Sequence, residues 1–261
     1  MSSFLVNKLD ILTFLSDLKP MKITEYISYA IDRLPKGYVF TYKVFYDEVK
    51  KKEAIIKALN RMADSGKITK LSKGKYYKPE RTQFGELQPN QYQVVKDLME
   101  EDGKVIGYLT GYSIYNELGL TTQVSNTIQI GKNVVRPKLK RGKYTIRFVR
   151  QKNTITKENI PLLQVLDSIR YIKKIPDTTI AKSTKRLKTI ISELLDEDKQ
   201  TMVRLAKKYP PSTRALLGAI LEELGHAEFT EKMRSSLNPI TTYNLPGVSD
   251  VLSAAEKWNI K

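Results

Sequence analysis

The sequence contains no cysteine and a single histidine, His226. Disulfide bonds, thiolate catalysis and cysteine-based zinc sites are therefore excluded, and no second histidine is present to share a metal ion. The chain also lacks an uninterrupted run of about 18 apolar residues, so a membrane-spanning helix is not expected. These absences favour a cytoplasmic protein that holds no metal ion or other cofactor.

The sequence patterns of common catalytic sites are missing as well. No glycine-rich phosphate loop of the Gly-x-Gly-x-x-Gly or Walker type occurs, and no Ser-His-Asp order is present. His226 follows a helix-ending glycine, where a cation suits the negative end of the helix dipole. The carboxylates at 196–198 and 222–223 read as solvated helix ends. We therefore expect that the protein is not an enzyme.

Positive charge is what the sequence has in excess. It holds 45 Lys and Arg residues against 28 Asp and Glu residues, a formal net charge of +17. Residues 1–80 carry 16 basic and 9 acidic side chains, and residues 81–160 carry 13 and 7, so most of the excess lies in the first 160 residues. A field of this sign favours polyanionic partners such as nucleic acid.

The length of 261 residues and the local patterns predict an α+β protein of several domains. We expect an N-terminal winged helix-turn-helix, a small mixed α/β middle domain and a C-terminal helical bundle. The sequence leaves open whether Met21 is an alternative start. The predicted segments are an amphipathic helix at 1–21, the winged helix at 22–80, the middle domain at 85–157, the bundle at 160–226 and an extension at 227–261, with a polar linker at 80–85.

The stretch 50–77 is the most informative part of the chain. Apolar residues at 55, 58, 59 and 62 fall on one stripe of a helix over 53–62, and polar or cationic residues fall opposite. Ser65-Gly66 ends this helix, since glycine readily takes a positive φ. Strands at 67–71 and 75–77 follow, joined by a turn at Lys73-Gly74. A helix with a cationic face beside a lysine-rich hairpin suits duplex DNA.

The preceding residues complete a winged helix-turn-helix. A first helix is predicted from the apolar stripe at 23, 27, 30, 31 and 34, and a short strand from 39–40. Thr41 then caps a second helix over 42–49. We expect Asn60 to read adenine and Arg61 guanine. The candidate DNA-binding residues are Thr41, Tyr42, Lys50, Lys52, Lys57, Asn60, Arg61, Lys70, Lys73 and Lys75.

A second group of cations lies between 132 and 152, where the sequence has no acidic residue. One interpretation is a second polyanion surface, for the same DNA or for RNA, because structural loops usually mix both signs of charge. The alternative is a solvated strand edge, where lysine blocks unwanted pairing. The candidates for this surface are Lys132, Arg136, Lys138, Lys140, Arg141, Lys143, Arg147 and Arg150, followed by Lys152.

Residues 108–124 read Tyr-Leu-Thr-Gly-Tyr-Ser-Ile-Tyr-Asn-Glu-Leu-Gly-Leu-Thr-Thr-Gln-Val, and a strand is predicted at 128–130. This stretch resembles the signature of AbiEi-type antitoxins of bacterial abortive-infection systems. The preceding segment is similar to the same family at Leu59-Asn60-Arg61-Met62, at Gly66-Lys67-Ile68 and at 73–77, which reads Lys-Gly-Lys-Tyr-Tyr. The resemblance covers residues 22–225.

The resemblance implies a transcriptional autorepressor that binds promoter repeats through its winged helix. It also implies an antitoxin domain that counteracts a nucleotidyltransferase-type toxin, which need not form a stable complex with the antitoxin. The chain departs from the family pattern by its long helical C-terminal portion and its extra N-terminal helix. These departures leave open whether a toxin partner exists.

The last third of the chain is predicted to be helical. Helices are expected at 161–175, 184–195, 198–209 and 212–224, with short connections that suggest a bundle. The tail after His226 is expected to run extended over the surface and to end in a helix over 248–261. Its lone tryptophan, Trp258, is expected to pack that helix against the body of the protein and not to stack on a base.

Three functions stay open at this point. The first is a DNA-binding autorepressor and antitoxin, whose partners are double-stranded promoter DNA and a cognate toxin. The second is an RNA-binding protein that uses the cations of 132–152. The third is an adaptor whose helical third docks a protein. A homodimer is compatible with the first, because winged helices often read palindromic sites.

Overall fold

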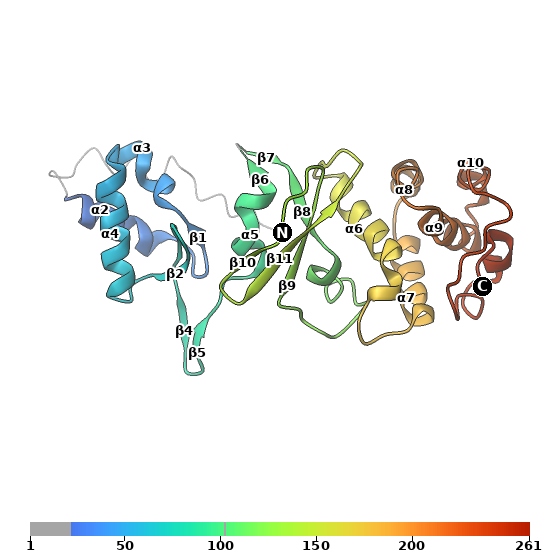
Figure 1. Cartoon of the computed structure of the whole chain (residues 1–261), viewed down its shortest axis with the longest axis horizontal. Helices are drawn as coiled ribbons and strands as arrows, with labels where there is room; N and C mark the ends of the chain where they lie inside the picture. The colour runs from blue at the N-terminus through green and yellow to red at the C-terminus, as the bar shows by residue number, and fades with distance from the viewer. Residues whose placement is uncertain (1–21, 102) are drawn as a thin grey trace. The chain divides into compact units, whose positions relative to one another are not determined.

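The computed structural model describes residues 22–101 and 103–261, and the helix predicted at 1–21 lies outside them. The chain has a mixed α+β fold, as predicted (Figure 1). It divides between Val94 and Val95 into two compact units. Along the described residues no helix is both long and apolar enough to cross a membrane.

The first unit begins with helices and a small sheet. Its strands form an antiparallel sheet in the order β1-β3-β2. The element order is helix, strand, helical turn, helix and hairpin, the order that the sequence predicted. The elements are α2 (Ile23–Arg33), β1 (Val39–Phe40), η2 (Tyr42–Phe45), α3 (Tyr46–Val49), α4 (Lys52–Asp64), β2 (Thr69–Ser72) and β3 (Lys75–Tyr77).

Local chemistry explains how these elements begin and end. The hydroxyl of Thr41 accepts a hydrogen bond from the backbone N–H of Lys43, so the predicted cap is confirmed. The second helix is a 3₁₀ turn followed by one α-helical turn, where the sequence predicted a continuous helix. Lys50 then takes a left-handed backbone with φ of 51°, and α4 begins two residues later. Gly66 and Gly74 take positive φ at the two predicted turns.

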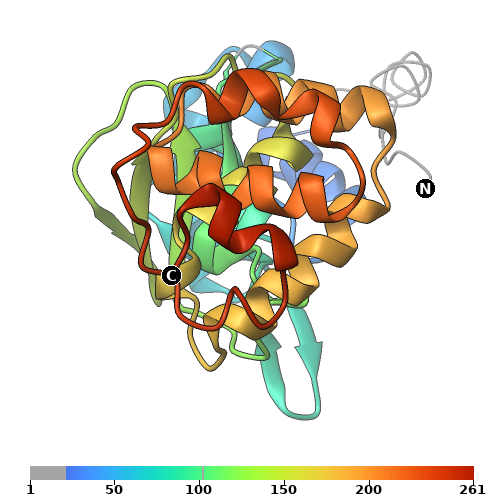
Figure 2. The ribbon, with the colours of Figure 1, turned by 90° about the vertical axis from the view of Figure 1, so that its right-hand side faces the viewer.

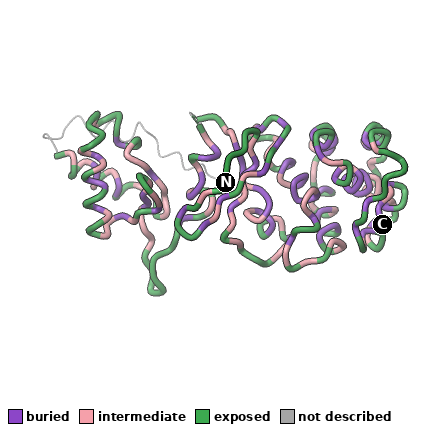
Figure 3. Tube along the Cα trace, in the orientation of Figure 1, coloured by how far each residue is buried: buried purple, intermediate pink, exposed green. Residues whose placement is uncertain are grey.

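The polar linker predicted at 80–85 is wrong, because these residues begin a second hairpin. It consists of β4 (Glu80–Thr82) and β5 (Gly85–Leu87), and Figure 3 shows it as largely exposed. The hydroxyl of Thr82 accepts from the N–H of Phe84 and donates to the carbonyl of Gly85, which closes the turn. Because the turn is held by local hydrogen bonds and not by burial, the sequence offered no hydrophobic alternation to reveal it.

The second unit combines a four-stranded sheet with helices. The sheet has the order β10-β11-β9-β8, in which β9 and β11 are parallel and the other pairs antiparallel. The strand predicted at 128–130 is confirmed, because it lies within β9. Helix α5 (Gln91–Met99) carries the boundary between the units, and the strands are β6 (Glu100–Glu101), β7 (Lys104–Val105), β8 (Gly107–Thr110), β9 (Thr127–Lys132), β10 (Leu139–Arg141) and β11 (Tyr144–Arg150).

The four predicted C-terminal helices are present, with ends shifted by one to five residues. Helix α9 is buried almost all round, with 215–221 inaccessible, and α6 and α8 pack beside it. Residues 111–119, which follow β8, form a 3₁₀ turn and then hydrogen-bonded turns. The helical elements are η3 (Gly111–Ser113), α6 (Asn159–Arg170), η4 (Ile172–Lys174), α7 (Ile180–Ser192), α8 (Asp196–Ala206), α9 (Pro211–Glu223), η5 (Ala227–Phe229), α10 (Glu231–Arg234) and η6 (Ser253–Trp258).

The tail does not run extended over the surface, which corrects the sequence prediction. Its residues Tyr243, Leu245 and Val248 are buried in the same core as the helices. Its end turns into η6 and not into the predicted longer helix, and Ile260 pairs with Tyr243 as a parallel bridge. Figure 2 shows this dark-red segment lying against the helices. Trp258 is 1% exposed against α9, so its predicted packing role is confirmed.

Candidate nucleic-acid interface

Helix α4 has one buried and one exposed face, as its sequence spacing predicted. Ile55, Ala58, Leu59 and Met62 lie in the core of the first unit. The opposite face is exposed and holds Lys52, Glu53, Lys57, Asn60, Arg61 and Asp64. Because its two acids stand near the helix ends, the centre of this face carries only cations and an amide.

The left-handed turn at Lys50 positions the start of this face. A non-glycine residue in this conformation costs about 1 kcal/mol, which the surrounding structure must offset. The turn joins α3 directly to α4, so that Lys50 and Lys52 both lie at the N-terminal end of α4 and are exposed. The ammonium of Lys52 lies 5.2 Å from the ring centre of Tyr42, a cation–π contact. The predicted residues Thr41 and Tyr42 are half-buried beside it.

The cations of the first unit divide into two groups. Lys67 forms an ion pair with Asp32 at 2.7 Å, and Lys78 donates to the carbonyls of Asp32 and Leu34, so both stabilise the fold. Within residues 22–101 and 103–261, no ion pair or hydrogen bond engages the side chains of the second group. That group consists of Lys50, Lys52, Lys57, Arg61, Lys70 and Lys73, all of them exposed candidates for DNA contact.

The amide of Asn60 is oriented by a residue that the sequence interpretation missed. The hydroxyl of Tyr76, on β3, donates a hydrogen bond of 2.6 Å to Oδ1 of Asn60. Tyr76 is 3% exposed, and burial raises the pKa of its hydroxyl, so it stays a donor at neutral pH. A carbonyl oxygen has two lone pairs, so Asn60 keeps one acceptor site and its amide donors for a base. The strand predicted at 75–77 was the available signal, because successive residues of a strand face opposite sides and Tyr76 therefore faces away from Lys75 and Tyr77.

The hairpin β2–β3 carries the remaining candidates. Lys70 and Lys73 are exposed, whereas Lys75 is half-buried and has an interaction within the fold. The base of the hairpin is held by Glu86 of β5, which accepts from the hydroxyls of Thr69 and Tyr77. Burial and the Glu86 carboxylate raise the pKa of Tyr77 to about 12. The second hairpin thus supports the first.

The cations of 132–152 do not share one environment. Arg141 is 8% exposed and forms a bidentate ion pair with Asp97 of α5, at 2.5 and 2.8 Å, so its place in a solvent-facing cationic surface is corrected. Lys132 is half-buried and donates to the carbonyl of Leu98, and burial lowers its pKa. Both were placed in the second surface because spacing within the run does not reveal contacts with α5.

The other members of the run are exposed. Register places Lys140 opposite Thr145, two residues from Arg147 on the same face of the sheet. Arg150 belongs to the other face, at the end of β11. Arg136 lies over the ring of Phe148 and Lys143 over the ring of Tyr144. The exposed cations are Arg136, Lys138, Lys140, Lys143, Arg147 and Arg150.

In the described part of the chain, no group of three His, Asp or Glu side chains is arranged to hold a metal ion. His226 stacks on Phe229 with ring centres 5.3 Å apart and lies 3.7 Å from Glu228 and 3.9 Å from Asp196. These contacts suit a residue at the end of a helix.

Comparison with known proteins places the chain in a family. Among curated proteins none matches it. The crystal structure of the RV2827C protein from Mycobacterium tuberculosis is similar over 85% of this chain and 84% of that chain, with a TM-score of 0.58 and 12% sequence identity. A likeness at this identity concerns the fold alone. The family model of DUF6088, a family of unknown function, matches residues 26–203, and the chain therefore belongs to the DUF6088 family.

Proposed function

We propose that this protein is a sequence-specific DNA-binding transcriptional regulator that uses a winged helix-turn-helix in residues 22–80. In this proposal α4 is the recognition helix and the β2–β3 hairpin is the wing. Helix α4 enters the major groove, which is about 12 Å wide and admits one helix. Asn60 and Arg61 then face base edges, and Lys70 and Lys73 neutralise phosphates.

One observation supports this proposal above the others. The exposed face of α4, the turn before it and the adjacent hairpin hold six cations that form no ion pair or hydrogen bond in the described residues, while neighbouring cations stabilise the fold. Asn60 is also held in place by Tyr76 before any ligand arrives, which lowers the entropy cost of reading a base.

We also propose, from the AbiEi-type resemblance, that the regulator acts on its own promoter and serves as an antitoxin. This role requires a neighbouring reading frame for a nucleotidyltransferase-type toxin. Without such a neighbour, DNA binding stays the proposed function and the antitoxin role is removed. Two alternatives are RNA binding through the exposed cations of 136–150 and docking of a protein partner. The binding assay below tests the first of them.

Replacing Arg61 with alanine should abolish much of the preference for the cognate duplex. A bidentate contact to guanine contributes about 1 to 3 kcal/mol of discrimination, roughly 5- to 150-fold in Kd. The measurement is fluorescence anisotropy with the duplex selected from random sequence by the wild-type protein and with a scrambled duplex. Arg234→Ala, which removes the same charge from an exposed position on α10, should leave the ratio of the two Kd values unchanged.

Two further measurements distinguish phosphate contacts from base contacts and DNA binding from RNA binding. Lys73→Ala should weaken binding to both duplexes by the same factor and should reduce the magnitude of the slope of log K against log salt concentration by about 0.9. Structured RNA is the competitor in the same assay. If Arg61→Ala retains the full preference of the wild type, α4 is not the recognition helix; if RNA outcompetes the selected duplex, the protein is an RNA binder.

The Tyr76–Asn60 contact gives a second prediction. Tyr76→Phe removes only the hydroxyl that orients Asn60, so discrimination at the adenine position should fall by about 1 kcal/mol, roughly fivefold. The measurement is the Kd for the selected duplex against the same duplex with that base pair changed. Tyr77→Phe is the matched control, because its hydroxyl bonds to Glu86 and not to α4. If Tyr76→Phe and Tyr77→Phe discriminate equally at this base pair, the hydrogen bond from Tyr76 is not needed to orient Asn60.

A further inference from the structure

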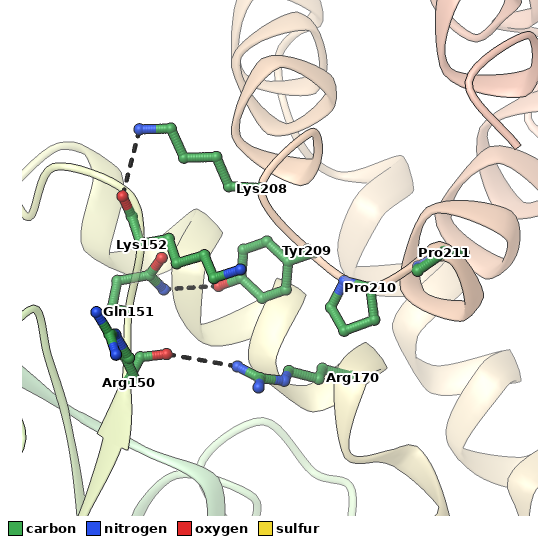
Figure 4. Close-up of a pocket in the computed structure, with 8 residues that line it drawn as sticks. All are labelled: Arg150, Gln151, Lys152, Arg170, Lys208, Tyr209, Pro210 and Pro211. Atoms are coloured by element: carbon green, nitrogen blue, oxygen red, sulfur yellow. Dashed lines mark hydrogen bonds between the residues drawn. The ribbon is translucent and has the colours of Figure 1, made fainter.

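The second unit contains a cationic pocket that the proposed DNA interface does not use. It has a volume of about 300 Å³ and lies where the end of β11, the end of α6 and the connection from α8 to α9 meet (Figure 4). The volume is at the lower end of the range for small-molecule sites, about 300 to 1,000 Å³. Four of its eight lining residues are cations, namely Arg150, Lys152, Arg170 and Lys208.

These cations come from three separate segments, yet the fold tethers them to one another. Arg170 donates to the backbone carbonyl of Arg150 at 3.5 Å, and Lys208 donates to that of Lys152 at 3.3 Å, as Figure 4 shows. Neither bond neutralises charge. In the described part of the chain no carboxylate forms an ion pair with any of the four. Four cationic residues therefore line the pocket without an ion-pair partner in the described part of the chain.

The polar groups behind the cations are already satisfied. Gln151 donates to the hydroxyls of Tyr108 and Tyr209, each at 2.8 Å, and accepts from the N–H of Asn153. Asp167 is 1% exposed and accepts from Tyr209 at 2.9 Å. The nearby carboxylate is therefore engaged within the core. A ligand meets cations, not free acceptors, so the pocket selects an anion.

We propose that this pocket binds a small molecule with two or three adjacent phosphate groups, of the nucleoside di- or triphosphate class. One phosphate monoester carries about −1.5 to −2 charge at pH 7, so a single group leaves about two of the four positive charges unbalanced. Two arginines supply planar, bidentate donors for phosphate oxygens. Tyr209, Pro210 and Pro211 line the pocket as well and provide an apolar wall for the nucleoside part.

The protein of 261 residues is titrated by calorimetry at about 0.15 M salt, where loosely attracted ions are largely screened. The ligands are tripolyphosphate, the four ribonucleoside triphosphates, the matching nucleosides and an RNA with a 5′-triphosphate. We expect the triphosphates to bind and the nucleosides not to bind. Tripolyphosphate should bind more weakly than the preferred nucleoside triphosphate, because it does not use the apolar wall.

Two variants and two matched controls locate the site. Arg170→Gln and Lys208→Gln should each weaken triphosphate binding about tenfold or more, as charge-assisted hydrogen bonds are lost. Arg204→Gln and Lys207→Gln remove the same charges from exposed positions of α8 and the residue that follows it, which do not line the pocket, and should bind as the wild type does. Circular dichroism checks that each variant is folded.

Three results would overturn the proposal. The first is no triphosphate binding at millimolar concentration. The second is an equal loss of triphosphate affinity in the pocket variants and in their controls, which indicates nonspecific electrostatic attraction of the anion to the protein surface. The third is that RNA with a 5′-triphosphate binds far more tightly than any nucleotide and that Arg170→Gln weakens this RNA binding as well. The pocket would then be a site for the end of an RNA. Since none of these variants lies in residues 22–80, failure here leaves the DNA-binding proposal untouched.

Discussion

Replacing Asp167 with alanine should lower the free energy of unfolding of the second unit by about 4 kcal/mol, because three buried hydroxyl donors lose a charged acceptor. Asp167 lies on α6 and accepts hydrogen bonds from Tyr108 and Thr110, each at 2.7 Å, and from Tyr209 at 2.9 Å. The loss corresponds to roughly 8 to 16 °C in Tm for a unit of this size. Urea unfolding followed by circular dichroism measures it, and a loss below about 1 kcal/mol would show that these hydroxyls find other partners.

The same residue makes stability depend on pH. Burial raises the pKa of Asp167 above its ordinary value of 3.8, although the hydroxyls of Tyr108, Thr110 and Tyr209 act in the opposite direction. The folded protein therefore binds this proton more tightly than the unfolded chain does. The resulting stabilisation is fully present below the unfolded pKa and is lost as pH rises through the folded pKa.

Asp167→Asn isolates this contribution, because the amide keeps the size of the side chain but does not titrate. The difference in unfolding free energy, wild type minus variant, should decrease as pH rises from 4 through the folded pKa of Asp167. Urea unfolding at a series of pH values measures the difference, and other titrating groups cancel in it. A difference that increases with pH would mean that the hydroxyl donors outweigh burial.

Replacing Gly218 with alanine should destabilise the second unit by about 1 to 3 kcal/mol through overpacking. Gly218 lies in the middle of α9, and an added Cβ would overlap the indole ring of Trp258 at Cη2. Trp258→Ala should cost about 3 to 5 kcal/mol, since it removes the largest fully buried side chain. It also removes the hydrogen bond of 2.9 Å from the indole to Glu222.

The double variant tests the contact itself. With Trp258 already alanine, Gly218→Ala should be neutral or stabilising by up to about 1 kcal/mol, because alanine is the better helix former. Circular dichroism is the required probe, since the chain has one tryptophan and the variant removes its fluorescence. Additive effects in the double variant would contradict direct contact between the two residues.

Elements that depend on local patterns were predictable. The buried stripe of α4, the turns at Gly66 and Gly74 and the helices α6–α9 follow from periodicity and from residues that stop helices. The β4–β5 hairpin was missed because only local hydrogen bonds mark it. Strand β10 was missed because it lies within the cationic run, where charge masked the pairing of Leu139 with Ile146.

Contacts between distant residues were not predictable. Exposure of Arg61 follows from the helix pattern, but the bond from Tyr76 to Asn60 depends on how β3 packs beside α4. Arg141 and Arg147 look alike in the sequence, yet Asp97 neutralises the first and leaves the second exposed. The reason is that spacing along the chain sets which face of an element a side chain takes, not what lies opposite that face.

The sequence by itself determined the positive charge, the absence of cysteine chemistry, the α+β character and the amphipathic recognition-helix candidate, because composition and short-range periodicity are properties of neighbouring residues. Tertiary structure alone decided which cations are free to meet a ligand. It brought Lys152 and Lys208, 56 residues apart, to the same pocket and buried Arg141 against α5. Charge acts through space, so only the folded chain converts a count of lysines and arginines into separate binding surfaces.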